Sequence, residues 1–270
     1  MEKPDSMIMY QVDVFTHQGI LGNPAAVVPL EYWPEDAWMQ VLARDIKLSE
    51  TAFFVPTRQE GCFELRWFTP QVEVELCGHA TLATAFVLRH WLEFAHERAE
   101  FQIRNGRLMV DYQTDAWLEI DLPAYPPRID ENPRKFHDLG LHEVSPVLCL
   151  RSNSHILVLE NETLVRAFKP DMGKIAGLDL SATIVTAPGD ETDYVLRYFA
   201  PAAGVPEDPA TGSAHCTLVP YWSQRLGLST LTARQLSERG GYFKCQDLGK
   251  RVRVAGRCSP RSHGIFALAG

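Results

Sequence analysis

The sequence lacks the features of membrane, secreted and nucleic-acid-binding proteins. No apolar run reaches the ~18 residues of a membrane-spanning helix. Its first residues show no basic stretch followed by an apolar one, so we expect neither a membrane partner nor a signal peptide. Positive charge is in deficit, since 26 Lys and Arg oppose 34 Asp and Glu to give a net charge of −8. Nucleic acid requires a basic face and is not an expected partner.

Cysteine occurs without a pairing pattern. None of the six cysteines forms a C-x-x-C pair. Without a secretory signal, reduced thiols are the default, and we expect a cytoplasmic protein. Most of the thiols should be small buried hydrophobes. A chain of 270 residues buries enough surface to fold without a disulfide or a structural metal.

Several motifs of enzyme chemistry are also missing. The sequence has no G-x-G-x-x-G or Walker-type loop and no G-x-S-x-G elbow. His90 and His96 are six residues apart, which does not fit the i, i+4 spacing of a helical zinc site. No motif therefore supports a metal or a nucleotide cofactor.

An internal repeat is the most informative feature that is present. The segments 60–70 and 191–201, offset by 131 residues, share Glu, Leu, Arg, Phe and Pro at equivalent positions. Two copies of this length predict two similar halves. We expect an N-terminal half at 1–121, completed by a last strand at about 258–270, and a C-terminal half at 122–257, with the proline-rich stretch 122–127 as linker. Pockets favour such junctions, so we expect the site between the halves.

Each half shows the same pattern of short strands and one unusual helix. The segment 80–88 has helical length but is apolar nearly all round, which predicts burial on every side. Its counterpart is 214–222, where Pro220 is expected to end or bend the helix. Pro34 is expected in the first turn of another helix. These patterns predict an α/β (α+β) fold, each half a rolled, mainly antiparallel sheet around a central buried helix.

Polar residues cluster where strands lead into the two buried helices. Gly78 and Gly212 stand at these helix starts, whose exposed N–H groups bind anions. His79 follows Gly78, and a helix N-terminus favours its neutral form. Asp208 and Ser213 flank Gly212, where a cap or turn explains them equally well.

Glu50 breaks the internal symmetry. It precedes the apolar run 52–55, and its repeat partner is Ala182. A single catalytic base need not occur in both halves, and partial burial raises a carboxyl pKa toward the range useful for proton transfer. An exposed Glu after a helix explains the position equally well.

Five motifs in order resemble the PhzF-like family of phenazine biosynthesis. They cover most of the chain and are Gly22-Asn23-Pro24-Ala25-Ala26-Val27-Val28, Ser49-Glu50-Thr51-Ala52-Phe53-Phe54, Phe68-Thr69-Pro70, Cys77-Gly78-His79-Ala80-Thr81 and Glu207-Asp208-Pro209-Ala210-Thr211-Gly212-Ser213-Ala214. This family is similar in fold to diaminopimelate epimerase and proline racemase. The resemblance implies a homodimer, no cofactor or metal, and a small anionic substrate.

The resemblance also implies roles for individual residues. In the phenazine enzyme a glutamate moves a proton within a dihydro-hydroxyanthranilate, and that role falls to Glu50, with His79 and Asp208 as further catalytic residues. Substrate binding falls to the positions Asn23, Gly78, Gly212 and Ser213. Two alternatives stay open. Cys77 matches one of the two cysteines of the racemase relatives, so the chain is alternatively an amino-acid epimerase, or else a non-enzymatic binding protein on the same fold.

Overall fold

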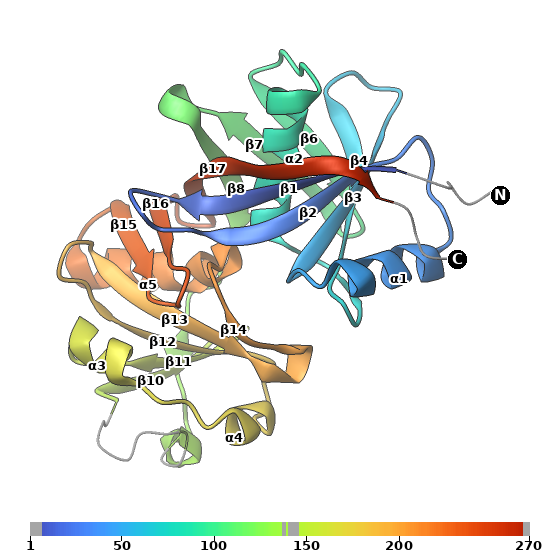
Figure 1. Ribbon diagram of the computed structural model, residues 1–270. Helices are drawn as coiled ribbons and strands as arrows, with labels where there is room; N and C mark the ends of the chain where they lie inside the picture. The colour runs from blue at the N-terminus through green and yellow to red at the C-terminus, as the bar shows by residue number, and fades with distance from the viewer. Residues whose placement is uncertain (1–6, 137–138, 140–145, 267–270) are drawn as a thin grey trace. The chain divides into compact units, whose positions relative to one another are not determined.

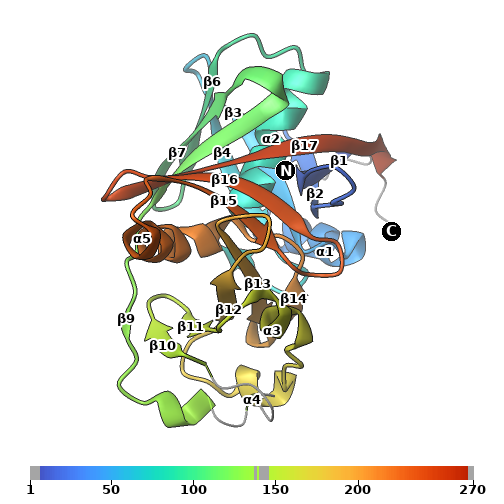
Figure 2. The same ribbon diagram turned by 90° about the vertical axis from the view of Figure 1, so that its left-hand side faces the viewer.

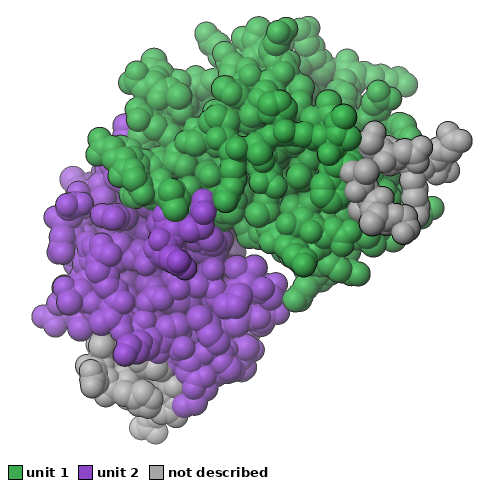
Figure 3. Space-filling model, in the orientation of Figure 1, with its two compact units in different colours: residues 1–121, 255–270 green, residues 122–254 purple. Residues whose placement is uncertain are grey.

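The computed structural model describes residues 7–136, 139 and 146–266, and the chain divides into two compact units (Figure 3). Unit 1 comprises Met1–Asp121 and Ala255–Gly270, and unit 2 comprises Leu122–Val254. Both units combine helices and strands (Figures 1 and 2), which confirms the predicted fold class. Within the described ranges, no helix is long and apolar enough to cross a membrane.

The strands of unit 1 close into a ring. In pairing order they are β1 (Met7–Thr16), β2 (Asn23–Pro29), β3 (Glu50–Pro56), β4 (Cys62–Phe68), β6 (Arg98–Ile103), β7 (Gly106–Tyr112), β8 (Trp117–Pro123) and β17 (Arg251–Phe266). Strand β17 enters unit 1 at Ala255 and pairs with both β1 and β8. The β2–β3 and β4–β6 pairs are parallel, whereas β1–β17, β1–β2, β3–β4, β6–β7 and β7–β8 are antiparallel.

One helix fills this ring. Helix α2 (Gly78–Trp91) contacts β1, β2, β3 and β7, and ten of its 14 residues are buried. Small side chains let the strands approach it closely. Its two buried threonines are satisfied within the helix, since Thr81 donates to the carbonyl of Cys77 at 2.6 Å and Thr84 to that of Ala80 at 2.8 Å. The predicted buried helix is thus confirmed.

Unit 2 repeats this strand order. Its strands are β9 (Arg128–Ile129), β10 (Leu148–Arg151), β11 (His155–Val158), β12 (Thr183–Pro188), β13 (Tyr194–Ala200), β15 (Thr230–Gln235) and β16 (Gly241–Asp247). The β11–β12 and β13–β15 pairs are parallel, as are their unit 1 counterparts β2–β3 and β4–β6. Two short strands, β5 (Glu73–Val74) and β14 (Val205–Asp208), pair antiparallel with β4 and β13. The sequence repeat is therefore a repeat of topology.

Each unit also repeats one arginine–glutamate pair ahead of its buried helix. Arg66 binds both carboxylate oxygens of Glu73 at 2.8 and 2.9 Å. Arg197 binds Glu207 in the same way, also at 2.8 and 2.9 Å. A bidentate pair fixes orientation as well as distance. The shared arginine of the sequence repeat thus anchors the short strands β5 and β14.

Two proline predictions at helices were wrong in part. Helix α1 (Asp36–Ile46) begins two residues after Pro34, because Glu35 takes the extended cap conformation. Helix α5 (His215–Leu226), preceded by the short 3-10 helices Pro201–Ala203 and Gly212–Ala214, runs past Pro220 instead of ending there. The proline ring deprives the Cys216 carbonyl of its helical donor, and the backbone N–H of Tyr125 donates to that carbonyl at 2.8 Å.

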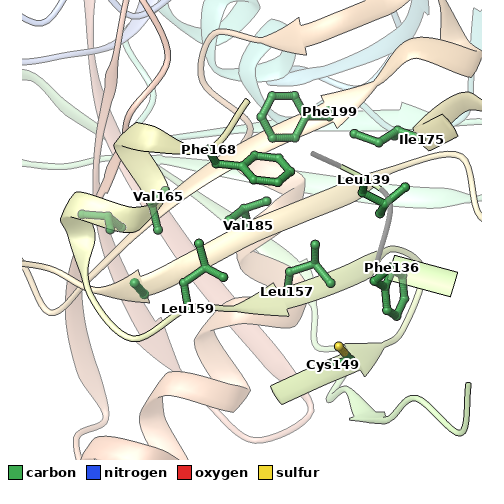
Figure 4. Close-up of a cluster of buried hydrophobic side chains, with 12 residues drawn as sticks. Phe136, Leu139, Cys149, Leu157, Leu159, Val165, Phe168, Ile175, Val185 and Phe199 are labelled. Atoms are coloured by element: carbon green, nitrogen blue, oxygen red, sulfur yellow. The ribbon is translucent and has the colours of Figure 1, made fainter. Parts of the chain in front are cut away.

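The sheet of unit 2 is covered on both faces. Helices α3 (Glu162–Ala167) and α4 (Met172–Ala176) contribute Val165 and Ile175 to an apolar cluster that includes Val185 of β12 (Figure 4). On the opposite face of β12, Thr186 accepts a hydrogen bond from the indole N–H of Trp222 in α5 at 3.1 Å. Side chains alternate across a strand, so cover on both faces explains why five of the six residues of β12 are buried.

The remaining short elements are the 3-10 helices Thr114–Ala116 and Pro133–Phe136. Five of the six cysteine side chains are buried, and that of Cys258 is half-buried. This confirms the prediction that most cysteines act as small apolar residues.

Candidate active site

Local turns in unit 1 place Asn23 and Glu50 at neighbouring strand starts. Gly22 has φ +69°, and a Cβ there would lie 2.2 Å from the carbonyl oxygen of Val14, so only glycine fits this turn. The chain then enters β2 at Asn23, which is fully buried. In the parallel register Ala25 faces Glu50, the first residue of β3. The Ser49 hydroxyl donates to Asn23 Oδ1 at 3.0 Å and ties the two strand starts together.

The start of α2 brings two further side chains to Glu50. Cys77 is the N-cap residue and His79 the second residue of the helix. His79 Nε2 lies 3.2 Å from Glu50 Oε2, and His79 Nδ1 lies 3.4 Å from Cys77 Sγ. The imidazole therefore stands between a carboxylate and a thiol.

Burial differs within this group in a way that matters chemically. The side chain of His79 is 5% exposed, whereas that of Glu50 is 17% exposed. The carboxylate is therefore the more accessible of the two to a small molecule. Burial lowers the pKa of His79 to about 3, so the ring is neutral at physiological pH. A proton on Nε2 would leave Nδ1 to accept from the Cys77 thiol, whereas Nε2 and Glu50 Oε2 lie close together without the geometry of a hydrogen bond.

In unit 2, Asp208 stands in a turn held by buried hydrogen bonds. It ends β14, and the hydroxyl of Thr211 donates to its Oδ2. Gln235, fully buried on β15, donates to the Asp208 carbonyl at 2.6 Å and accepts from the Thr211 backbone N–H at 2.8 Å. One side-chain amide thus bonds to two backbone groups of the turn.

This turn leads directly into the helix start at Gly212, which the sequence predicts as a substrate-binding position. Gly212 is buried at the first position of the 3-10 helix Gly212–Ala214, and the half-buried Ser213 follows it. The first N–H groups of a helical segment have no partner within the helix. Ala210, just before this segment, packs closely against Gly241. A Cβ on Gly241 would lie only 2.6 Å from that of Ala210.

The structure thus gathers the predicted residues into two groups. Unit 1 brings together Glu50, Cys77 and His79, with Gly78 at the start of the same helix and Asn23 at the neighbouring strand start. Unit 2 holds Asp208, Gly212 and Ser213 on one continuous segment. Their individual roles stay predictions.

Sequence reasoning missed Gln235 and Thr211. Gln235 lies 24 residues beyond Thr211 and is brought to the turn by β15, which pairs in parallel with β13. No local pattern marks a glutamine whose partners are backbone groups from a distant turn. Thr211 lies within the motif 207–214. Its hydroxyl, three residues after Asp208, was the one feature that could have predicted the hydrogen bond between these two side chains.

Known proteins resemble this chain in sequence and in architecture. Residues 12–264 match the family model described as phenazine biosynthesis-like protein. The chain is 48% identical over 263 residues to an uncharacterized isomerase of Pseudomonas aeruginosa, covering 97% of this chain and 96% of that protein. It is 37% identical over 292 residues to the human phenazine biosynthesis-like domain-containing protein, covering 97% of each.

Solved structures extend the similarity to the fold. A PhzF-family protein of Enterococcus faecalis superposes with a TM-score of 0.91 at 38% identity, covering 97% of this chain and all of that one. A hydroxyproline epimerase of Agrobacterium vitis superposes with a TM-score of 0.67 at 9% identity, covering 99% of this chain and 94% of that one. At that identity the epimerase shares the fold alone.

Proposed function

Because this chain belongs to the phenazine biosynthesis-like protein family, we propose that it is an isomerase that moves a proton within a small carboxylate-bearing molecule. The relatives named as isomerases support the reaction class. The observation that carries the proposal for this chain is the Glu50 carboxylate, partly exposed and 3.2 Å from a buried histidine. No cofactor is required, because the same group removes and returns the proton.

Glu50 acts as base and then as acid in the proposed reaction. It takes a proton from a carbon beside a carbonyl or a conjugated system, and the electrons of the C–H bond move into that system. The protonated carboxyl then returns the proton to another carbon, which shifts the double bond. His79 stays neutral beside the carboxylate, and their 3.2 Å contact tightens into a hydrogen bond when substrate is bound, which stabilises the ionised base before and after the transfer.

The other predicted residues bind the substrate or assist the proton transfer. Backbone N–H groups at Gly78 and Gly212 suit a carboxylate, since helix starts favour negative charge. Asn23 and Ser213 supply further hydrogen bonds, and Asp208 assists proton transfer. The substrate class is a cyclic amino or hydroxy acid with conjugated double bonds, such as a dihydro-hydroxyanthranilate. We further propose that the protein is a cytoplasmic homodimer.

A second candidate follows from the position of Cys77. Its sulfur lies 3.4 Å from the Nδ1 atom of His79, so a thiol and a carboxylate flank one ring. An amino-acid epimerase would use Cys77 as one of its two acid–base groups. Inactivation by iodoacetamide that substrate prevents would favour this reaction, and full activity of Cys77→Ala would exclude it.

Solvent deuterium exchange tests the proposed reaction class. The protein is incubated in heavy water with a panel of cyclic and α-amino carboxylates, including the dihydro-hydroxyanthranilate, and each compound is followed by NMR. Exchange with double-bond migration supports the isomerase. Exchange at an α-carbon with loss of optical activity supports the epimerase. Binding to a panel member without exchange at any carbon would contradict both and favour a binding protein.

A further inference from the structure

Unit 1 contains a polar pocket that is separate from the group around Glu50. Its volume is about 560 Å³, which lies in the range of small-molecule sites. Three segments line it: the turn 16–20 after β1, Asp115 and Ala116 between β7 and β8, and residues 257–259 of β17. The residues assigned to the proposed reaction are not among them.

A bulge in β1 shapes one wall of this pocket. The register of β1 against β17 shifts between Val14 and Thr16, and Thr16 then pairs with Arg257. The bulged residue, Phe15, is fully buried and has φ +66°. Its ring packs on Gly256, where a Cβ would lie 2.3 Å from the ring carbon Cδ1. Since a bulge changes the direction of the side chains that follow it, this packing places Thr16 beside Arg257.

The backbone of the other walls is also unusual. Gln18 and Gly19 have positive φ in the turn that follows β1, and so do Asp115 and Ala116 in the turn between β7 and β8. Residues other than glycine rarely adopt this conformation. Such positions cluster at ligand sites, where the surrounding structure holds them in place.

Arg257 brings a positive charge to the pocket. Among the described residues no carboxylate lies within ion-pair distance of its guanidinium, and its buried Nε has no hydrogen-bond partner. The guanidinium carbon lies 5.2 Å from the centre of the Trp117 ring, a cation–π contact that limits its movement. By contrast, Arg261 on the same strand bonds to Asp13 at 3.1 Å. The terminal nitrogens of Arg257 are therefore available to an anionic ligand.

The lining favours a carboxylate over a phosphate. A single guanidinium matches the plane and the two oxygens of a carboxylate. The hydroxyls of Thr16 and Ser259, 3.1 Å apart, offer a further donor. The exposed Asp115 also lines the pocket and repels a doubly charged phosphate more than a singly charged carboxylate. Ile20 supplies apolar surface for the rest of the molecule.

We propose that this pocket binds a small monocarboxylate with a hydrocarbon part, and that Arg257 is its main ligand-binding residue. The site does not rest on the proposed isomerase, because none of its residues has a role in that reaction.

NMR titration of the full-length protein with sodium benzoate tests the site. The Arg257 Nε–H signal, identified by its absence in Arg257→Gln, should shift and saturate, together with the backbone amide signals of Gln18 and Gly19. In Arg257→Gln these amides should report a Kd at least roughly tenfold higher, since a charge-assisted pair is lost. Arg261→Gln is the matched control, because its guanidinium already has a partner, and it should bind benzoate like wild type.

Two further measurements define the ligand and the role of Arg257. Inorganic phosphate at the same ionic strength should bind more weakly than benzoate, and Asp115→Asn should reduce that difference. Arg257→Lys keeps the charge without the planar fork and should recover part of the affinity, which also keeps the test available if Arg257→Gln does not fold.

Three results would overturn the proposal. A wild type without benzoate-dependent shifts at Arg257, or variants at Arg257 that bind as tightly as wild type, would exclude the site. Tighter binding of phosphate than of benzoate would exclude the carboxylate as its ligand. These readouts need no turnover, so failure here leaves the isomerase untouched, and failure of the exchange assay leaves this site untouched.

Discussion

Acid should destabilise this fold through two buried histidines, His79 and His215. Burial lowers the pKa of each to about 3 from an ordinary value of 6.5. Above pH 6.5 both rings are neutral in the folded and the unfolded chain, so their contribution to stability is complete there. As the pH falls from 6.5 toward 3, the unfolded chain takes up protons that the folded chain excludes, and stability is lost.

The size of this effect follows from linkage. Where the unfolded chain binds one more proton than the folded chain, the free energy of unfolding falls by ~1.4 kcal/mol per pH unit for each ring. Across the whole interval the loss is about 5 kcal/mol for each ring. That is a large part of the 5–15 kcal/mol that is roughly typical of folded domains.

Urea unfolding at about pH 5.5 and about pH 4.5 measures this slope. His79→Gln removes one ring, so the pH dependence of its unfolding free energy should be shallower than that of wild type by ~1.4 kcal/mol per unit. His96→Gln, which removes an exposed imidazole from a surface pair with Glu60, is the matched control and should follow wild type. An unchanged slope in His79→Gln would show that the ring is charged in the folded chain and that burial does not lower its pKa.

Two further substitutions test how the strands and turns around the two groups are held. Gln235→Leu removes a fully buried amide and leaves the Thr211 N–H and the Asp208 carbonyl without its hydrogen bonds. Urea unfolding should therefore show that the free energy of unfolding falls by about 2–4 kcal/mol. A fall below about 0.5 kcal/mol would contradict this role. Gly22→Ala places a Cβ 2.2 Å from the carbonyl oxygen of Val14 and should cost about 3 kcal/mol or more. Gly19→Ala, with similar φ but nothing within 4 Å, should cost only about 1–2 kcal/mol, and equal losses would show that steric contact is irrelevant.

Periodicity and repeat were enough to predict much of the architecture. The segment 80–88 has no polar face, and such a helix is stable only when sheet surrounds it, as it does here. The repeated arginine was visible in the sequence at Arg66 and Arg197, but its glutamate partners were not, because Glu73 and Glu207 follow at unequal spacings of seven and ten residues.

Other features depend on contacts that no local pattern records. The end of α5 could not be predicted from Pro220, since the backbone of Tyr125, far away in sequence, supplies the missing hydrogen bond. The position of Gln235 depends on strand pairing in the same way. The motif around Gly78 did predict Glu50 and His79 as candidates, whereas their contact at 3.2 Å required the register of β2 against β3.

In the proposed reaction the Glu50 carboxylate carries the proton. The most direct measurement is the rate of deuterium incorporation into the exchanging substrate by Glu50→Gln, beside Glu60→Gln, which alters an exposed glutamate that also contacts a histidine at 3.1 Å. Exchange should fall by about a thousandfold or more in Glu50→Gln, as expected when an acid–base group is lost, and should stay at the wild-type rate in Glu60→Gln. Exchange that survives Glu50→Gln but disappears in Cys77→Ala would exclude Glu50 from this role and identify the thiol as the acid–base group.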